Sequence, residues 1–486
     1  MGDTLTLAQA RALWWQKQAL GRASTGPLGT VLAKSGWLRT LGGADVYLAA
    51  RARRPGMKRE ELDAVMESGE LRVVPAARGC IYVVPAAMVG DLMALNAGAW
   101  RKSAEKDLAK VGSSMAVIEG LAKGVLAALT VPMTTDAVRK ALPAEAIPSF
   151  GDVGKKAGIS SPLPFVLRLL ELQGKVERTL ERGRLDSDRY LWRKAEWPVA
   201  PAAAEPLDSM IGAFLDFAGP VTLGHMNKWS GVAQRDLKPV IQRLGAVPVT
   251  IDGIGDAWVR TGDIGAAMRA PPPTGVALLA FEDNYLVSHG TLGAVTDARH
   301  HAIEANIWGG DKPEALGTAD HVLSRTIVID GLISGFWEVD PSTKGAVWMT
   351  FEPASKLLAG KLDELTHDAA KFLLGEIGHA RVFSLDTMEL VQDRANRVAD
   401  LRDGKKPRAA MAKPAAVKPV AVKPPAPPKP VKAPAPAKLV AAKPAAKKPA
   451  AKQPAAKKPA AKKPAAKKPA AKKQAAKKQA AKKKKR

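Results

Sequence analysis

Hydrophobic residues near the N-terminus first follow a helical period and then an alternating one. Thr6 and Gln9 have the spacing of a capping box, which predicts that a helix begins at Leu7. The elements predicted along this part of the chain are helices at Leu7–Leu20, Thr30–Lys34, Ala44–Arg53 and Lys58–Glu67 and strands at Leu71–Pro75 and Cys80–Pro85. Helices followed by a hairpin that carries Arg72 and Arg78 are typical of a winged helix.

The same succession of helices and hairpin recurs twice. The second copy has predicted helices at Thr134–Leu142 and Leu163–Gln173 and predicted strands at Lys175–Leu180 and Arg189–Lys194. In the third copy, Thr222 is the expected N-cap of a helix that ends at Trp229, and the turn at Gly231 leads into a second helix, Ala233–Leu244. A tight turn of this kind lets a helix-turn-helix set its second helix into the DNA major groove. Pro239 lies inside that second helix and is expected to kink it, which weighs against base reading by this unit.

Strand-like patterns dominate from Pro271 to Arg394. The predicted elements are strands at Val276–Phe281, Tyr285–His289, Thr326–Asp330, Leu332–Val339 and Ala346–Phe351 and an amphipathic helix at Lys361–Ile377. We therefore predict an α+β fold, in which tandem winged-helix units precede a small β-barrel or sheet domain. The expected bounds are 1–130 for a first winged helix with extra helices, 131–200 for the second, 205–262 for the third, 271–395 for the β-rich domain and 405–486 for a C-terminal tail.

The net charge of +27 is concentrated in that tail. The chain has 486 residues with 74 Lys+Arg and 47 Asp+Glu, and the tail, Lys405–Arg486, holds 28 of the basic side chains and no acidic one. The preceding 404 residues, the body, therefore carry 46 basic and 47 acidic side chains. All Trp, Tyr and Phe residues lie in the body, so it can form packed cores, and the chain is neither a uniformly basic particle nor wholly disordered.

The tail is a polycation that cannot form a core of its own. Of the 37 prolines, 16 lie between Pro407 and Pro469, and proline together with repelling lysines favours disorder. Such a chain binds double-stranded DNA by counterion release without reading its sequence, and its composition resembles the tails of linker histones. The lysines expected to contact DNA are Lys447, Lys448, Lys457, Lys458, Lys462, Lys463, Lys467, Lys468, Lys472 and Lys473. A solubility tail or a lipid-binding tail is the alternative, although no apolar anchor accompanies the lysines and we expect no membrane partner.

Other chemical signals in the sequence are sparse. The single cysteine, Cys80, excludes an intramolecular disulfide and a multi-cysteine zinc site. His300 and His301 have no partners at metal-ligand spacing, and no glycine-rich phosphate loop is present, so we expect neither a metal nor a cofactor. Without a signal peptide or an apolar run of about 18–20 residues, a soluble, cytoplasmic and nucleoid-associated protein is expected. The sequence also shows no coiled coil, which favours a monomer.

The densest basic stretch of the body is Arg51–Arg59, beside the first hairpin. The body residues expected to contact DNA are Arg51, Arg53, Arg54, Lys58, Arg78, Arg168, Gln234, Arg235 and Lys238. A solvated face is the alternative for such a run of charge.

Seven segments of the body, in order, resemble one known family. They read LTLAQARAL, ARGCIYVVPAAM, LPFVLRLLELQGKVER, RLDSDRYLW, HMNKWSG, LLAFEDNYLVSH and IDGLISGFWE. Together they resemble the AlkZ/YcaQ-like DNA glycosylases over residues 5–395. The resemblance implies tandem winged helices and a β-barrel, and the unhooking of bulky N7-alkylpurines and interstrand crosslinks by N-glycosidic hydrolysis. It also implies that Asp283, Asn284, Tyr285 and His289 shape the DNA channel or the pocket, the alternative being a polar strand end with satisfied hydrogen bonds.

The catalytic residues of that family do not carry over to this chain. The family has Gln-apolar-Gln or Gln-apolar-Asp shortly before a Tyr-Leu-Ala segment, whereas here Arg39-Thr40-Leu41 precedes Tyr47-Leu48-Ala49. Tyr82 stands where the family's hairpin usually has His. Hydrolysis through an oxocarbenium-like centre needs an amide or a carboxylate, and Asp45 is the weak candidate for a substitute. The alternative for Asp45 is an exposed residue that caps the following helix.

Three hypotheses follow. The first is a winged-helix DNA-binding protein held on DNA by its tail, with catalysis lost or altered. The second is an active alkylpurine or crosslink DNA glycosylase, a hydrolase, that uses another residue. The third is a transcription regulator whose β-rich domain senses a ligand. The missing glutamines favour the first hypothesis over the second, and the lack of a dimerisation helix weighs against the third.

Overall fold

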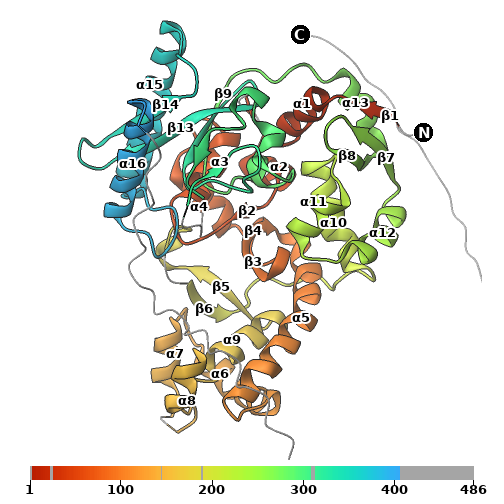
Figure 1. Cartoon of the computed structure of the whole chain (residues 1–486). Helices are drawn as coiled ribbons and strands as arrows, with labels where there is room; N and C mark the ends of the chain where they lie inside the picture. The colour runs from red at the N-terminus through yellow and green to blue at the C-terminus, as the bar shows by residue number, and fades with distance from the viewer. Residues whose placement is uncertain are drawn as a thin grey trace, which may run out of the picture. The chain divides into compact units, whose positions relative to one another are not determined.

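The computed structural model describes residues 3–21, 24, 26–143, 145–187, 190–307 and 312–405 (Figure 1). All of them belong to one unit of the chain, which spans Met1–Ala421. The predictions of disorder and of DNA-contacting lysines in the tail fall outside the described residues.

The first helices and hairpin form as predicted. An additional strand near the N-terminus pairs with a strand of the third copy. The Thr6 hydroxyl accepts a hydrogen bond from the Gln9 amide (3.2 Å) and the Gln9 side chain accepts one from the Thr6 amide (2.9 Å), so the capping box is confirmed. The elements are β1 (Asp3–Leu5), α1 (Leu7–Lys17), α2 (Leu28–Ser35), β2 (Leu38–Arg39), α3 (Asp45–Arg53), α4 (Arg59–Glu67), β3 (Leu71–Pro75) and β4 (Ile81–Pro85). Strand β4 lies between β2 and β3, whereas β1 runs parallel to β7 (Ala246–Ile251).

Helices α5 (Val89–Lys110) and α6 (Met115–Ala128) lie within the bounds expected for the first copy with its extra helices. The second copy has the elements α7 (Thr135–Ala141), α8 (Gly151–Ala157), α9 (Leu163–Leu172), β5 (Val176–Leu180) and β6 (Tyr190–Lys194), of which α8 is an addition to the prediction. The predicted helices α7 and α9 and the predicted hairpin β5–β6 are confirmed, and they share a core with α5 and α6. Among the described residues no single helix has the length and apolar composition of a membrane span. One pair, Ala86–Lys110 with Met115–Ala128, passes that test only when its two helices, bent by 105°, are taken together.

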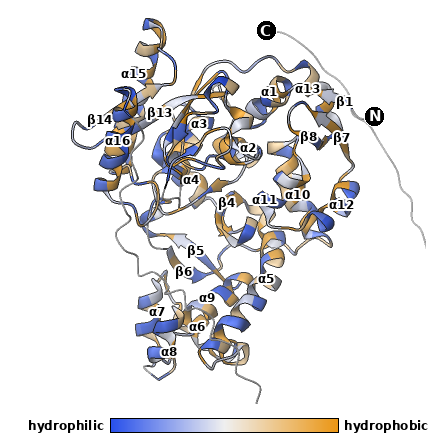
Figure 2. Cartoon of the chain, in the orientation of Figure 1, coloured by the Kyte–Doolittle hydropathy of each residue, from blue (hydrophilic) through white to orange (hydrophobic). Residues whose placement is uncertain are grey.

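The third copy forms the predicted pair of helices. Its elements are α10 (Pro206–Ala218), α11 (Leu223–Ser230), α12 (Gln234–Arg243), β7, β8 (Gly255–Arg260) and α13 (Ile264–Arg269). The Thr222 hydroxyl accepts a hydrogen bond from the His225 amide at 3.0 Å, and Gly231 ends α11 in the left-handed region with φ 78°. Helix α12 is amphipathic, with Leu237, Val240 and Ile241 buried, and Figure 2 shows both hydrophobic and hydrophilic residues along it.

The β-rich part is an open antiparallel sheet in the order β14-β13-β12-β9, which is the sheet rather than the barrel form of the prediction. Its elements are β9 (Val276–Leu279), α14 (Asn284–Val287), β10 (Glu304–Ala305), β11 (Glu314–Ala315), β12 (Arg325–Ile329), β13 (Leu332–Asp340), β14 (Gly345–Thr350), α15 (Lys356–Lys371), the π-helix Phe372–Ile377 and α16 (Met388–Arg402). Helices α15 and α16 lie beside β14 (Figure 1). The prediction of a strand at Tyr285–His289 is wrong, because the Asp283 side chain accepts a hydrogen bond from the Tyr285 amide (3.0 Å) and starts a helical turn there.

A buried chain of ion pairs ties the sheet to the first helices and to α16. Arg325 is fully buried and pairs with Asp45 at the start of α3 and with Glu338 on β13. Glu338 also accepts a hydrogen bond from Arg394 on α16 (2.8 Å), whose guanidinium reaches Asp386 (2.7 Å). Such charges are stable in the interior only while every partner is present.

Replacing Arg325 with Met should therefore destabilise the protein by about 3–5 kcal/mol, because the buried Asp45 loses its guanidinium partner and the buried Glu338 keeps only Arg394. Urea denaturation at neutral pH measures this free energy of unfolding. The matched control is Arg299→Met, which removes an ion pair with Glu352. The Arg299 side chain is 69 % exposed, so this change should cost about 0–1 kcal/mol. Equal losses in the two variants would contradict the role given to the buried chain.

Candidate functional site

The segment Arg39-Thr40-Leu41 is fixed from two sides. In the β2–β4 pairing, Arg39 lies directly opposite Tyr82, and the Thr40 amide donates to the carbonyl of Ile81 (3.2 Å). On the other side the Ser384 amide donates to the Leu41 carbonyl (2.8 Å). Arg39 and Tyr82, two of the positions at which the sequence is expected to depart from the family pattern, are thus neighbours across one pair of strands.

Arg39 forms an ion pair with Glu282, a residue that the sequence pattern did not single out. The two side chains are 26 % and 11 % exposed. Glu282 has φ 55°, a left-handed conformation that is uncommon for residues other than glycine and that clusters at functional sites. Its place between Phe281 and Asp283, in the segment that resembles the family, is the signal that could have drawn attention to it.

Tyr82 is buried beside these charges. Burial raises the pKa of its hydroxyl, while the positive charges of Arg39 and Arg78 act in the opposite direction. The phenol is therefore neutral and does not supply the titratable nitrogen atoms of an imidazole.

The space around Arg39 and Glu282 is filled. The cavity measures about 10 Å³ and is lined by Trp37, Leu38, Arg39, Asp45, Ala49, Arg53, Phe281, Glu282, Asp283 and Asn284. A volume of this size has room for about one water molecule and none for a nucleobase.

Asp45 lies in the interior, and both of its carboxylate oxygens have partners. One oxygen accepts a hydrogen bond from the Phe281 amide (2.6 Å) and the other accepts one from Nε of Arg325 (3.1 Å). Burial raises the pKa of Asp45, and the Arg325 guanidinium opposes that rise. The expectation of an exposed capping residue is wrong, because the N-cap of α3 is Ala44 and Asp45 is buried in the first turn.

The segment from Asp283 to His289 contributes mostly to the interior. Asp283 forms a bidentate ion pair with Arg53, and both side chains are fully buried. The side-chain amide of Asn284 donates to the Trp37 carbonyl (2.8 Å), and the Tyr285 hydroxyl donates to the Gly331 carbonyl (2.7 Å). Asp283 and Asn284 line the small cavity, whereas Tyr285 and His289 form internal contacts away from it.

His289 is held as a neutral ring. It stacks on Trp14, with 3.8 Å between ring centroids, and its Nε2 lies 2.9 Å from the Ala218 carbonyl. Burial, together with the charge repulsion of the nearby His225, lowers the pKa of His289 to about 3. Burial also lowers the pKa of His225, to about 4.

Most basic residues of the stretch beside the first hairpin have hydrogen-bond or ion-pair partners elsewhere in the body. Arg51 donates to the Met57 carbonyl and to Asp368, Arg54 donates to the Gly26 carbonyl, and Lys58 pairs with Glu376. Arg53 is fully buried, so the prediction that it contacts DNA is wrong: a bidentate pair with Asp283 holds it in the interior.

The remaining predicted DNA contacts divide in the same way. Arg168 is mostly buried and pairs with Glu171 (2.7 Å). Arg78, Gln234, Arg235 and Lys238 are exposed.

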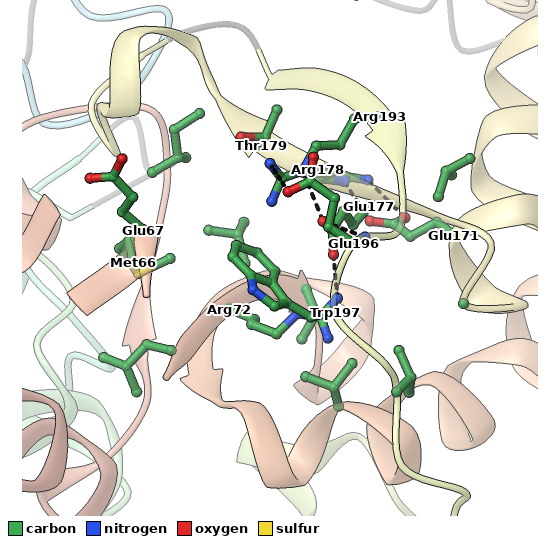
Figure 3. A pocket seen from close by; sticks show the side chains of 18 of the residues that line it. Met66, Glu67, Arg72, Glu171, Glu177, Arg178, Thr179, Arg193, Glu196 and Trp197 are labelled. Carbon is green, nitrogen blue, oxygen red and sulfur yellow. Dashed lines mark hydrogen bonds and ion pairs between the residues drawn. The ribbon is translucent and has the colours of Figure 1, made fainter. Parts of the chain in front are cut away.

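A second, larger cavity of about 550 Å³ lies between the first two hairpins (Figure 3). The labelled charged side chains on its wall largely pair with one another: Arg72 and Arg193 both reach Glu177, and Arg178 reaches Glu171. The Trp197 ring lies under the Arg193 guanidinium, 4.6 Å from it. The hydroxyls of Thr40 and Tyr190 are 3.3 Å apart and connect the β5–β6 hairpin to the Arg39 segment.

Three comparisons relate the chain to known proteins. A family model described as "DNA glycosylase AlkZ-like" matches residues 30–373. The "Interstrand DNA cross-link repair glycosylase" of Streptomyces sahachiroi is 27 % identical over 150 residues, which cover 30 % of this chain and only 37 % of that protein. The solved structure "Streptomyces sahachiroi DNA glycosylase AlkZ" has a TM-score of 0.59 at 20 % identity and covers 78 % of this chain and 98 % of that one.

The buried His289 makes stability depend on pH in a defined direction. An unfolded histidine takes up a proton below about pH 6.5, whereas the folded ring resists protonation down to about pH 3, so stability is complete above the first value and declines below it. Between pH 6.5 and pH 4.5 one such group contributes a loss of about 2–3 kcal/mol.

In urea titrations over this pH range, His289→Gln should show a smaller decline in the free energy of unfolding than the native protein. The control is His367→Gln, on the exposed side of α15, which should keep the native pH dependence. Parallel pH profiles for His289→Gln and the native protein would refute the assignment.

Proposed function

Because the chain belongs to the AlkZ-like DNA glycosylase family, we propose that it is a DNA-binding protein that has lost the family's N-glycosidic hydrolysis. Its helix-turn-helix segments would act as winged-helix units, and its tail would hold it on double-stranded DNA without regard to sequence. A protein bound in this way would associate with the nucleoid and would work as a monomer.

The observation that carries the loss of catalysis is the Arg39–Glu282 ion pair. Hydrolysis of a glycosidic bond builds positive charge on the sugar, and an amide or a free carboxylate stabilises that charge and orients the attacking water. A guanidinium at position 39 repels the same charge, and Leu41 has no polar atom to offer. The 10 Å³ cavity beside the pair supports the same conclusion, since an extruded purine has no space there.

The tail supports the tether. It holds 28 basic side chains and no acidic one, against a body with 46 basic and 47 acidic side chains. Binding by counterion release scales with the number of phosphates neutralised, so the tail supplies most of the non-specific affinity.

An active glycosylase is the second candidate, and one observation favours it. Glu282 places a carboxylate beside the position of the missing motif, and it is partly exposed. N7-alkylated purines are cationic and leave readily, so even an ion-paired carboxylate could assist their release.

Incubation with duplex DNA that contains 7-methylguanine or an interstrand crosslink should yield no abasic sites above background. The Streptomyces sahachiroi glycosylase, assayed on the same duplexes, is the positive control. Robust base release that is abolished by Glu282→Gln or by Asp45→Ala would overturn the proposal in favour of the second candidate.

Deletion of residues 405–486 should remove most of the affinity for undamaged duplex DNA and flatten its salt dependence, because each phosphate contact contributes about −0.9 to the slope of log K against log salt. Fluorescence anisotropy over a range of salt concentrations measures both quantities. A matched control keeps the tail and replaces its lysines with glutamine, and it should behave like the deletion. Unchanged binding by both proteins would rule out the tether.

A further inference from the structure

The tip of the first hairpin is a rigid turn that presents Arg78. Arg78 has φ 56° and Gly79 has φ 71°, so two successive residues are left-handed. The Ala76 amide donates to the Cys80 carbonyl (2.8 Å), and the Asn96 side chain on α5 donates to the carbonyls of Pro75 (3.3 Å) and Ala76 (3.2 Å). The backbone that carries Arg78 is thus fixed before any partner binds.

The stem of Arg78 packs on the turn of the third copy. A Cβ atom placed on Gly231 would lie 3.0 Å from Cγ of Arg78, so the glycine is needed both for its left-handed φ and for this close approach. The turn itself is rigid, because the Asn227 side chain donates to the Val232 carbonyl (2.8 Å). A hairpin tip from the first copy therefore lies against the helix-turn-helix of the third.

Helix α12 begins directly after this turn and exposes one polar face. Gln234, Arg235 and Lys238 are exposed, and the Arg235 side chain is 87 % exposed. Residues at positions 234, 235 and 238 are neighbours on a helix surface because they are three and four positions apart. Asp236 lies 3.4 Å from Arg235 and offsets part of its charge.

We infer that Arg78 and the exposed face of α12 form one contact surface for the phosphodiester backbone of duplex DNA. The inference rests on the proposed function and deepens it by naming where the body meets DNA. In this arrangement the first hairpin acts as the wing for the recognition helix of the third copy, although Arg78 and Gln234 are 156 positions apart in sequence. The surface offers guanidinium, ammonium and amide donors, which suit phosphate oxygens, and it includes no aromatic side chain for stacking on bases.

A comparison of the body's basic residues by their internal partners also supports this surface. Arg51, Arg53 and Arg168 have partners inside the protein, whereas Arg78 and Lys238 extend from exposed positions next to the same turn. Internal ion pairs would have to break before the first group could bind phosphate, whereas Arg78 has the neutral hydroxyl of Tyr82 as its partner, which costs less to leave than a buried carboxylate.

The test uses the full chain and an undamaged duplex of about 20 base pairs, long enough for roughly two turns of DNA. The variant carries Arg78→Gln, Arg235→Ala and Lys238→Ala, where glutamine at position 78 keeps the aliphatic stem over Gly231. Losing up to three phosphate contacts should reduce the salt slope by about 2–3 and weaken binding at each salt concentration. The matched control removes three other exposed lysines, Lys123, Lys155 and Lys156 on α6 and α8, and should keep the native slope.

Hydrogen exchange on the same complexes gives a second readout. Duplex DNA should slow amide exchange in peptides that cover Ala76–Cys80 and α12 in the native chain and should not do so in the triple variant. A native salt slope in the triple variant, or an equal reduction in the control, would overturn the surface. Base release in the glycosylase assay would instead overturn the proposed loss of catalysis and leave this result standing, so the two failures are distinguishable.

Discussion

The buried ion pair between Arg53 and Asp283 connects the helical beginning of the body to its β-rich part and sets the geometry of the candidate site. Both side chains are fully buried, and Gln18 accepts a further hydrogen bond from the same guanidinium (3.0 Å). Loss of either partner would leave an uncompensated charge in the interior, so the pair fixes the last turn of α3 against the start of α14. Glu282 and Asn284 are the sequence neighbours of Asp283, so the buried pair also fixes their backbone. The face that Glu282 presents to Arg39 therefore depends on a contact between residues 230 positions apart.

Local features of the fold could be predicted from the sequence, and distant contacts could not. The Thr6 and Thr222 caps, the β3–β4 and β5–β6 hairpins and the helix-turn-helix of the third copy all follow from residues within a few positions of one another. The predicted strand at Tyr285–His289 is instead part of a helical turn, because its apolar pattern is short and the Asp283 cap outweighs it. The parallel pairing of β1 with β7 carries no local signal at all.

The candidate site shows the same division. Arg39 and Tyr82 were identified by comparison with a family pattern, and the structure brings them together across β2 and β4. Glu282 was missed because its partner lies far away in sequence. A run of arginines is usually solvated, which predicts a surface position for Arg53. Only the fold shows that Arg53 pairs with the buried carboxylate of Asp283. The near-neutral body reflects this use of charge: many of its arginines neutralise internal carboxylates, which leaves the attraction for polyanions to the tail.

The pairing of β1 with β7 has a consequence for the order in which the chain acquires its structure on the ribosome. Asp3 lies opposite Val249, and the Trp14 indole donates to the carbonyl of Pro220 (3.1 Å). Strand β1 and the Trp14 indole therefore lack these two partners until the third copy has left the exit tunnel. During that interval Trp14 and Trp15, both buried in the finished protein, remain open to solvent and to chaperones. The segment Asp3–Leu5 is thus made long before the strand that secures it, Ala246–Ile251.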